Sequence, residues 1–255
     1  MHELLPFYQC YRAYVRGKVL AFLLDELEIS PEQRLAAEQQ ARALFTLAAY
    51  YASAPAQPTV VMLGGLMGTG KSTLANALQQ ELGWTLFSSD EVRKHLAQVA
   101  PTRPHADAFG QGIYGPEWTA QTYETLRQKM KAALADGRSV LLDASFARSA
   151  DRQALAKEAL LANAAVVFIE CVCERATALE RLATRWHMHL EGQPTTTASD
   201  GRPEFYEAQK AIWQTIQPDE VPDMMHTIVN TTLPVSLCIA QILEQCHVPR
   251  LSCWL

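Results

Sequence analysis

The chain has 255 residues, of which 49% are hydrophobic and 19% charged, an ordinary composition for one large globular domain or two small ones. Its net charge of −5 argues against the strongly basic surface of a nucleic-acid-binding protein at whole-chain level. No apolar run approaches the roughly 18 residues of a membrane-spanning helix, and the first residues do not form a secretion signal. The six cysteines contain no C-x-x-C pair, which favours reduced thiols and a cytoplasmic location.

The first segment of the chain predicts a hairpin of two helices, over residues 4–28 and 31–51. The first helix carries an apolar stripe at helical spacing, formed by Leu4, Tyr8, Tyr11, Val15, Val19 and Phe22. Ser30 is expected to cap the second helix, with Gln33 as the reciprocal residue of a capping box. Because such a hairpin cannot bury both of its faces alone, we expect it to pack on something else, either a partner domain or a second copy of the chain.

The clearest domain boundary follows this hairpin, where residues 53–58 read Ser-Ala-Pro-Ala-Gln-Pro. The sequence therefore predicts a helical hairpin over residues 1–54 and a second domain over residues 59–247.

An apolar strand is predicted over residues 59–63, and it leads into Gly65-Leu66-Met67-Gly68-Thr69-Gly70-Lys71-Ser72. This stretch fits G-x-x-x-x-G-K-[ST], the phosphate-binding P-loop, and a predicted helix over residues 73–82 follows it. The glycines allow backbone N–H groups to approach a phosphate, the lysine can reach the β- and γ-phosphates, and the serine can ligate Mg²⁺. The predicted ATP-binding residues are Gly65, Gly68, Thr69, Gly70, Lys71, Ser72 and Thr73.

Strands and helices alternate from residue 59 onward, which is the pattern of an α/β fold with a parallel sheet. The further strands are predicted over residues 84–87, 139–143, 166–169 and 227–229. The further helices are predicted over residues 90–98, 117–136, 149–163, 174–189, 204–217 and 235–245. A turn-rich stretch over residues 99–115 and a polar loop over residues 191–202 are long enough to be functional.

Two aspartates follow predicted strands, at the sheet edge where ligands of such folds bind. Asp90 can accept the proton of an acceptor hydroxyl, or it can belong to a helix cap with the capping-box spacing of Ser88 and Glu91. Asp143 ends the run Val-Leu-Leu-Asp and resembles the Walker B aspartate that assists Mg²⁺, although many buried strands end in aspartate.

Five arginines are candidates for contacts with anionic groups. Arg181 and Arg185 lie one turn apart before the polar loop and can close over ATP as a lid, or they can form surface ion pairs with nearby glutamates. Arg93, Arg148 and Arg152 are candidates for gripping an anionic substrate.

Four segments together resemble the zeta-toxin and polynucleotide-kinase-like P-loop kinases, whose ATP-binding domain is of AAA type. They are Gly65 to Ser72, Ser89 to Arg93, Leu142-Asp143-Ala144-Ser145-Phe146 and the helix with Arg181 and Arg185. The resemblance implies a three-layer fold with a five-stranded parallel sheet and transfer of the ATP γ-phosphoryl group to a hydroxyl. It also implies functional roles for Lys71, Ser72, Asp90, Arg181 and Arg185.

Residues 11–18 of the hairpin resemble the final helices of an aminoglycoside-phosphotransferase-like domain, which some bacterial proteins carry upstream of such a P-loop domain. The catalytic segments of that domain would precede residue 1, so the resemblance implies no antibiotic-kinase activity for this chain.

The sequence as a whole predicts a cytoplasmic Mg-ATP-dependent kinase acting on a small hydroxyl-bearing molecule, with Asp90 as the acceptor-side carboxylate. A polynucleotide 5′-kinase is the alternative within the same chemistry, and the acidic net charge argues against it. A non-catalytic ATP-binding module remains the alternative outside enzymes.

Overall fold

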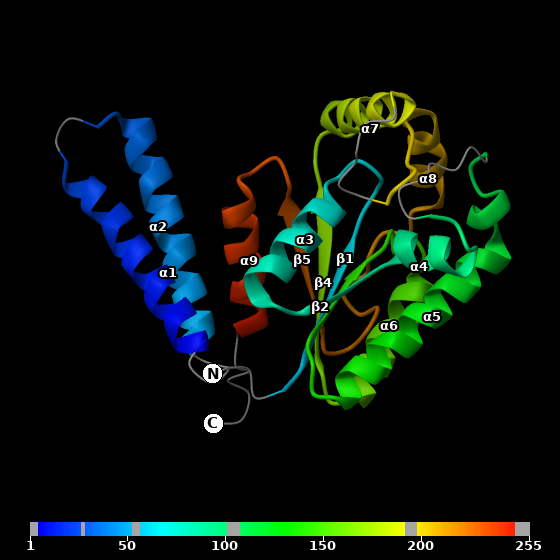
Figure 1. Cartoon of the computed structure of the whole chain (residues 1–255), viewed down its shortest axis with the longest axis horizontal. Helices are drawn as coiled ribbons and strands as arrows, with labels where there is room; N and C mark the ends of the chain where they lie inside the picture. The colour runs from blue at the N-terminus through cyan, green and yellow to red at the C-terminus, as the bar shows by residue number, and fades with distance from the viewer. Residues whose placement is uncertain (1–4, 27–28, 53–56, 101–107, 192–197, 248–255) are drawn as a thin grey trace. The chain divides into compact units, whose positions relative to one another are not determined.

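The computed structural model describes residues 5–26, 29–52, 57–100, 108–191 and 198–247. The chain divides into two compact units, of which the second comprises residues 57–232 and the first comprises the segments on either side of it. Figure 1 shows the two kinds of architecture: packed helices in the first unit and a helix-covered sheet in the second.

The second unit is built on a five-stranded parallel sheet with the strand order β2-β3-β1-β4-β5. The strands are β1 (Thr59–Gly64), β2 (Thr85–Ser88), β3 (Val140–Asp143), β4 (Ala165–Val172) and β5 (Met224–Asn230). Leu63 of β1 and Ser88 of β2 both pair with Asp143 of β3, so the carboxyl ends of these three strands lie together. The predicted α/β fold with a five-stranded parallel sheet is confirmed.

Helices cover both faces of this sheet, because its central strands are buried on both sides. They are α3 (Lys71–Leu82), α4 (Ser89–Leu96), α5 (Pro116–Ala135), α6 (Ser149–Leu161), α7 (Arg175–Leu190) and α8 (Tyr206–Ile212), with short 3₁₀ helices η3 (Gly112–Tyr114) and η4 (Pro203–Phe205). The main core joins α5 and α6 to alternate residues of the strands, Val60, Met62, Val140, Leu142, Val166 and Phe168. The intervening residues point to the opposite face, and α3 contacts β1, β2 and β3.

The first unit contains α1 (Leu5–Phe22), η2 (Leu23–Asp25), α2 (Pro31–Ala52) and α9 (Val235–His247). The predicted helical hairpin is present, and its capping box is confirmed. Ser30 N donates to Gln33 Oε1 at 3.0 Å, and Gln33 N donates to Ser30 Oγ at 3.2 Å. The predicted domain over residues 59–247 includes α9, whereas the structure groups α9 with the hairpin, because α2 packs against both α1 and α9.

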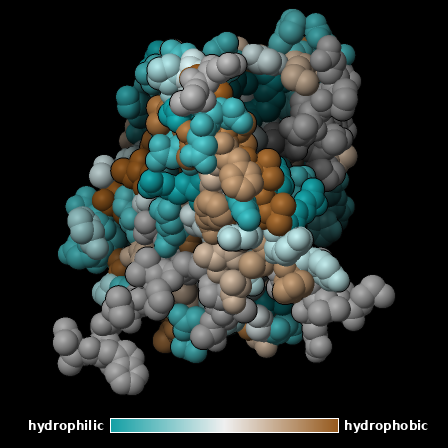
Figure 2. All heavy atoms as spheres, turned by 90° about the vertical axis from the view of Figure 1, so that its left-hand side faces the viewer, coloured by the Kyte–Doolittle hydropathy of each residue, from teal (hydrophilic) through white to brown (hydrophobic). Residues whose placement is uncertain are grey.

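Small residues form the face of α1 that packs on α2. Ala13 is buried, and a Cβ on Gly17 would lie 3.1 Å from the Phe45 ring and 3.3 Å from the Ala41 carbonyl oxygen. The opposite face of α1 exposes large apolar side chains, Phe7, Tyr8, Tyr11, Val15, Val19 and Phe22. Figure 2 shows hydrophobic residues gathered in the middle of the face turned toward the viewer.

Two predicted helices end earlier in the structure than in the sequence prediction. The first ends at Phe22 and tightens into η2. The helix predicted over residues 204–217 is α8, which ends at Ile212 because Trp213 is extended. Gln214 then bonds to the start of α6, donating from its backbone N to Ala147 O and accepting from Ser149 N at its side-chain oxygen. Within the residues that the structure describes, no helix is both long and apolar enough to cross a membrane.

Candidate nucleotide and acceptor site

The loop between β1 and α3 has a backbone that only glycine allows at three positions. Gly65, Gly68 and Gly70 have φ values of +133°, +78° and +84°. A Cβ on Gly65 would lie 2.4 Å from Cys171 O, and one on Gly68 would lie 2.5 Å from Ala178 O. This loop leads directly into α3, whose first-turn N–H groups have no partner within the helix and so favour an anion.

Lys71, the first residue of α3, lies across this loop. Its Nζ donates to Leu66 O at 2.8 Å. Burial lowers the pKa of the Lys71 ammonium, while the nearby carboxylates of Asp143 and Asp90 oppose that shift. The lysine is therefore a buried cation beside two carboxylates. Because burial makes an uncompensated positive charge costly, a phosphate in the loop would stabilise the charged form of Lys71.

Ser72 and Asp143 meet at the carboxyl end of β3. Asp143 is 5% exposed, and burial raises the pKa of its carboxyl group to about 6, although Lys71 and a hydrogen bond from Ser72 oppose the shift. An aliphatic hydroxyl and a carboxylate are hard oxygen ligands of the kind that Mg²⁺ takes in nucleotide sites. These two residues therefore fit a magnesium ion bound between protein and phosphates.

Thr69 and Thr73, the two threonines of the loop region, differ in their surroundings. Thr69 is buried, and its Oγ1 donates to Leu66 O at 2.7 Å, which closes the turn of the loop. Thr73 is exposed in the first turn of α3.

Asp90 is the second residue of α4, directly after β2. Ser88 occupies the N-cap position and forms no side-chain capping bond, so the capping box considered from the sequence is not formed. The described residues offer the Asp90 carboxylate no hydrogen bond. Burial lowers the pKa of both Lys71 and Arg185, and the negative charge of Asp90 partly offsets this lowering. The carboxylate is thus close enough to Lys71 of the phosphate loop and to Arg185 of α7 for its charge to act on both.

The two predicted lid arginines have different contacts. Arg181 donates to Thr231 Oγ1 at 3.2 Å and to Thr231 O at 3.0 Å. Thr231 follows β5, and its hydroxyl donates to Thr69 O at 2.6 Å. A Cβ on Gly70 would lie 3.4 Å from Arg181 Nη1. Arg181 is therefore held beside the phosphate loop by the end of β5.

Arg185, one turn further along α7, donates from Nη2 to Gly201 O at 3.2 Å. Its Nε is buried without a hydrogen-bond partner among the described residues. Burial lowers the pKa of its guanidinium group, and the charges of Asp90 and Asp200 oppose that shift. One donor of Arg185 is thus left without an acceptor among the described residues.

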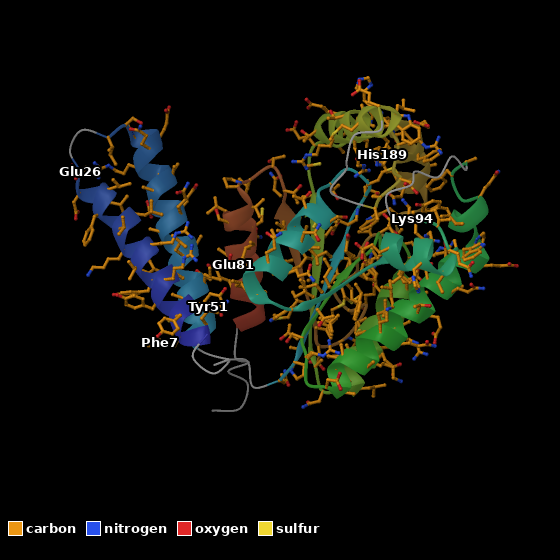
Figure 3. The ribbon with its side chains drawn as sticks, in the orientation of Figure 1. Phe7, Glu26, Tyr51, Glu81, Lys94 and His189 are labelled. Atoms are coloured by element: carbon orange, nitrogen blue, oxygen red, sulfur yellow. The ribbon has the colours of Figure 1, made fainter. Side chains whose placement is uncertain are left out.

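A hydrogen-bonded cluster of three side chains, two of them buried, adjoins Asp90. Lys94 Nζ donates to Asp200 Oδ1 at 2.9 Å, and Tyr114 Oη donates to Asp200 Oδ2 at 2.8 Å. The side chains of Lys94 and Asp200 are 1% and 3% exposed. Figure 3 labels Lys94 on α4 and His189 on α7, the two helices that flank this region. The cluster ties the loop after α7 to α4 and η3.

The three arginines predicted to grip a substrate lie in different surroundings. Arg93 is buried over the ring of Tyr114, with Nη1 donating to Ile113 O and Nε unpartnered among the described residues. Arg148 is exposed at the N-cap of α6. Arg152 is fully buried, forms a bidentate ion pair with Glu220 at 2.6 Å and donates to Phe146 O. Because these bonds engage its guanidinium group inside the core, Arg152 is not available to a substrate.

Residues 60–199 match the family model described as "AAA domain", which is more than half of the chain. The chain belongs to this AAA-domain family. The chain is also 27% identical over 183 residues to the uncharacterized protein Rv2004c of Mycobacterium tuberculosis, and the uncharacterized protein Mb2027c of Mycobacterium bovis matches equally. The alignment covers 72% of this chain but 35% of the relatives, so the chain spans about a third of their length.

Solved P-loop structures share the fold of this AAA domain. An unliganded sugar kinase from Janibacter sp. HTCC2649 aligns over 75% of this chain and 96% of its own, with a TM-score of 0.53 and 16% identity. A putative kinase from Chloroflexus aurantiacus j-10-fl aligns over 74% and 98%, with a TM-score of 0.54 and 18% identity. Kti12 from Chaetomium thermophilum, in complex with ADP-AlF3, aligns over 73% and 96%, with a TM-score of 0.53 and 16% identity.

Residues outside the predicted set also take part in this region of the second unit. Lys94 lies one helical turn after Asp90, so helical spacing could have placed it on the same face of α4. Thr231 follows the last strand, which is where a sheet edge presents its ligands. Tyr114 and Asp200 lie in turn-rich and polar stretches that carry no local pattern, and the sequence offered no signal for them.

The phosphate loop has a further contact, made by α8. Met67 N donates to Gln209 Oε1 at 2.6 Å. A small apolar cluster accompanies this bond, in which Leu66 and Met67 pack against Ala178, Leu182 and Tyr206. The loop of this AAA domain is therefore in contact with the two helices that follow β4.

Proposed function

We propose that this protein is a Mg-ATP-dependent kinase that transfers the γ-phosphoryl group of ATP to a hydroxyl group of a small molecule. The observation that carries the proposal is the position of Asp90. Its unbonded carboxylate lies near enough to both Lys71 and Arg185 to influence their pKa values, and those residues belong to the phosphate loop and to the helix α7. A carboxylate placed beside a phosphate-binding loop is what acceptor activation requires.

In the proposed reaction the acceptor hydroxyl oxygen forms a new bond to the γ-phosphorus as the bond to the β–γ bridging oxygen breaks. ADP leaves with the electron pair of that bond, and the hydroxyl proton passes to the Asp90 carboxylate. Lys71 and Arg185 offer positive charge to the oxygens of the transferring group, and Arg181 holds the phosphate loop to the end of β5.

Ser72 and Asp143 are the residues that would hold the magnesium ion. When bound, Mg²⁺ neutralises and orients the β- and γ-phosphates for in-line transfer. Two protein oxygens suit this ion, which retains several waters and takes phosphate oxygens as its other ligands. The described part of the chain contains no group of three or more His, Cys, Asp or Glu side chains that could hold a metal ion by themselves.

The acceptor we propose is small, as in the zeta-toxin-like kinases, and it carries an anionic group. Arg93 supports the anionic group, since its Nε is buried and unpartnered among the described residues; Arg148 is a second candidate contact. The net charge of −5 makes a polynucleotide acceptor unfavourable. The free cysteines of the described chain and the use of ATP support a cytoplasmic location.

The proposal is tested by measuring Mg-ATP affinity and slow ATP turnover in the wild type and in Asp90→Asn. In this assay water takes the place of the acceptor hydroxyl. We expect the variant to bind ATP within about threefold of the wild type and to lose turnover by about 10²-fold, the usual scale for an acid–base group. Asp136→Asn is the matched control, because Asp136 lies at the far end of α5 with its side chain 65% exposed.

A wild type that binds ATP without any turnover would favour a non-catalytic ATP-binding module. Turnover that survives in Asp90→Asn would remove this residue from the chemistry, and loss of ATP affinity in that variant would move it to the nucleotide or metal.

A further inference from the structure

The loop after α7 contains a carboxylate, Asp200, that is almost fully removed from solvent. Asp200 is 6% exposed and accepts hydrogen bonds from Lys94 and Tyr114, which come from α4 and η3. The partners are separated from it by 106 and 86 residues in the sequence, so the contact is made only when the fold is complete. Asp200 therefore joins three segments at one point.

Stability alone is a poor explanation for this cluster. Moving a lysine and a carboxylate out of water is costly, and replacing such a buried pair by apolar residues of similar size is often neutral or stabilising. A buried ion pair with an additional tyrosine bond does, however, fix the relative position of the segments that it joins. The arrangement is thus better suited to holding a geometry than to raising stability.

The geometry in question involves both halves of the proposed site. On the α4 side, Lys94 lies one turn after Asp90, the proposed acceptor-side carboxylate. On the α7 side, the residue after Asp200 is Gly201, whose carbonyl oxygen accepts from Arg185 Nη2 at 3.2 Å. The consecutive residues Asp200 and Gly201 therefore connect α4, which carries Asp90, to Arg185, the arginine proposed to meet the transferring phosphoryl group.

The fit at Gly201 leaves little room for adjustment. A Cβ there would lie 3.0 Å from Arg185 Nη2, 3.3 Å from Leu182 and 3.4 Å from Met67 of the phosphate loop. A shift of Asp200 would thus be transmitted directly to Arg185 and to the loop beside it.

We propose that Asp200 is a positioning residue for phosphoryl transfer: its bonds to Lys94 and Tyr114 lock the loop after α7 onto α4, and the adjoining Gly201 carbonyl then sets Arg185 opposite Asp90. This inference rests on the proposed kinase function. It assigns to Asp200 no contact with ATP or with the acceptor.

The test compares four variants of the full chain with the wild type. Asp200→Asn weakens the lock, Tyr114→Phe removes one of its bonds, and Lys94→Met with Asp200→Leu removes both charges together. Glu220→Gln is the matched control, because the Arg152–Glu220 ion pair is equally buried, at 0% and 3% exposure, but joins α6 to the segment after α8. Mg-ATP affinity, ATP turnover and melting temperature are measured for each protein.

We expect Asp200→Asn and the double variant to keep Mg-ATP affinity within about threefold and to lose turnover by about tenfold or more, since small displacements of catalytic groups are costly. Tyr114→Phe should lose less. The double variant should melt near the wild type or above it, whereas Glu220→Gln should melt lower and keep its turnover below its melting range. Hydrogen exchange should be faster at residues 198–202 in Asp200→Asn than in the wild type.

The cluster would be merely structural if the double variant turned over ATP as fast as the wild type. The same conclusion would follow if the loss of turnover tracked the melting temperature across all four variants. Unchanged hydrogen exchange at residues 198–202 in Asp200→Asn would contradict the proposal that Asp200 fixes this loop on α4. A wild type that neither binds nor turns over ATP would remove the proposed function first and the role of Asp200 with it, so the two failures are distinguishable.

Discussion

Lys71 is held in the phosphate loop by a backbone carbonyl, and burial makes its charge unfavourable there. We therefore expect Lys71→Ala to abolish measurable Mg-ATP binding while the free protein melts no lower than the wild type, because no core packing is lost. In the wild type, saturating Mg-ATP should raise stability, by about 2.7 kcal/mol at a hundredfold excess over Kd. Thermal melts with and without Mg-ATP measure both effects; an unchanged ligand shift in the variant would exclude the loop from nucleotide binding.

Asp143 has a pKa that burial raises from 3.8 to about 6. A carboxyl group whose pKa is raised in the folded state binds its proton more tightly there than in the unfolded state. Its contribution to the free energy of unfolding is therefore complete below a pH of about 4 and is lost as the pH rises through about 6. The loss is on the order of 3 kcal/mol. Unfolding of the wild type and of Asp143→Asn, both in EDTA, should therefore show the wild type weakening relative to the variant from pH 4 to pH 7. Parallel pH profiles would contradict the raised pKa.

The residues of the site that could be predicted from the sequence are those with a local signature. Lys71 and Ser72 belong to one contiguous motif, and Asp90 follows a recognisable strand, so short-range patterns sufficed. Asp200 and Tyr114 acquire their meaning from a contact between distant segments, which no local periodicity encodes. Arg152 illustrates the converse: its position after β3 suggested a ligand contact, and only the fold reveals its buried partner Glu220.

At the scale of elements, the order of strands and helices was predictable, because alternating apolar runs and helical spacing are strong signals. The residues at which helices and strands end were harder to predict. The capping box at Ser30 and Gln33 marked the start of α2 correctly, since it is a local hydrogen-bond pattern. The end of α8 was not marked, because it depends on tertiary bonds from Gln214 to α6.

The segment after α8 is attached to α6 by the ion pair between Arg152 and Glu220, both buried. Breaking a buried pair leaves an uncompensated charge and costs about 3–5 kcal/mol. We expect Glu220→Gln to lower the melting temperature by several degrees with unchanged Mg-ATP affinity. Differential scanning calorimetry measures the first effect and isothermal titration the second. A variant as stable as the wild type would mean that the buried guanidinium group finds other acceptors.

At the scale of the whole molecule, α1 has two apolar faces of different kinds. Its small-residue face packs on α2, and the opposite face exposes aromatic side chains such as Phe7 and Tyr11, at 63% and 60%. Exposed apolar surface of this kind typically marks an interface. A partner domain or self-association through the hairpin therefore remains our proposal.

Self-association through this face is tested with Tyr11→Glu combined with Val19→Glu. We expect these charges to lower the average mass of the full chain in light scattering over a concentration series, since they would be buried in any contact. Mg-ATP affinity should not change. Gln40→Glu, on an exposed position of α2, is the control. Equal masses for the wild type and the double variant would leave a partner domain as the occupant of this face.

The first unit is discontinuous in sequence, since α9 joins α1 and α2 only after the intervening residues 57–232. During synthesis the ribosome must therefore complete the whole second unit before α2 can meet α9. At ordinary elongation rates of about 5–20 residues per second, this delay is on the order of ten seconds or more. The hairpin emerges before the second unit and completes its packing after it, so its face for α9 is open to chaperones and to premature association during that interval.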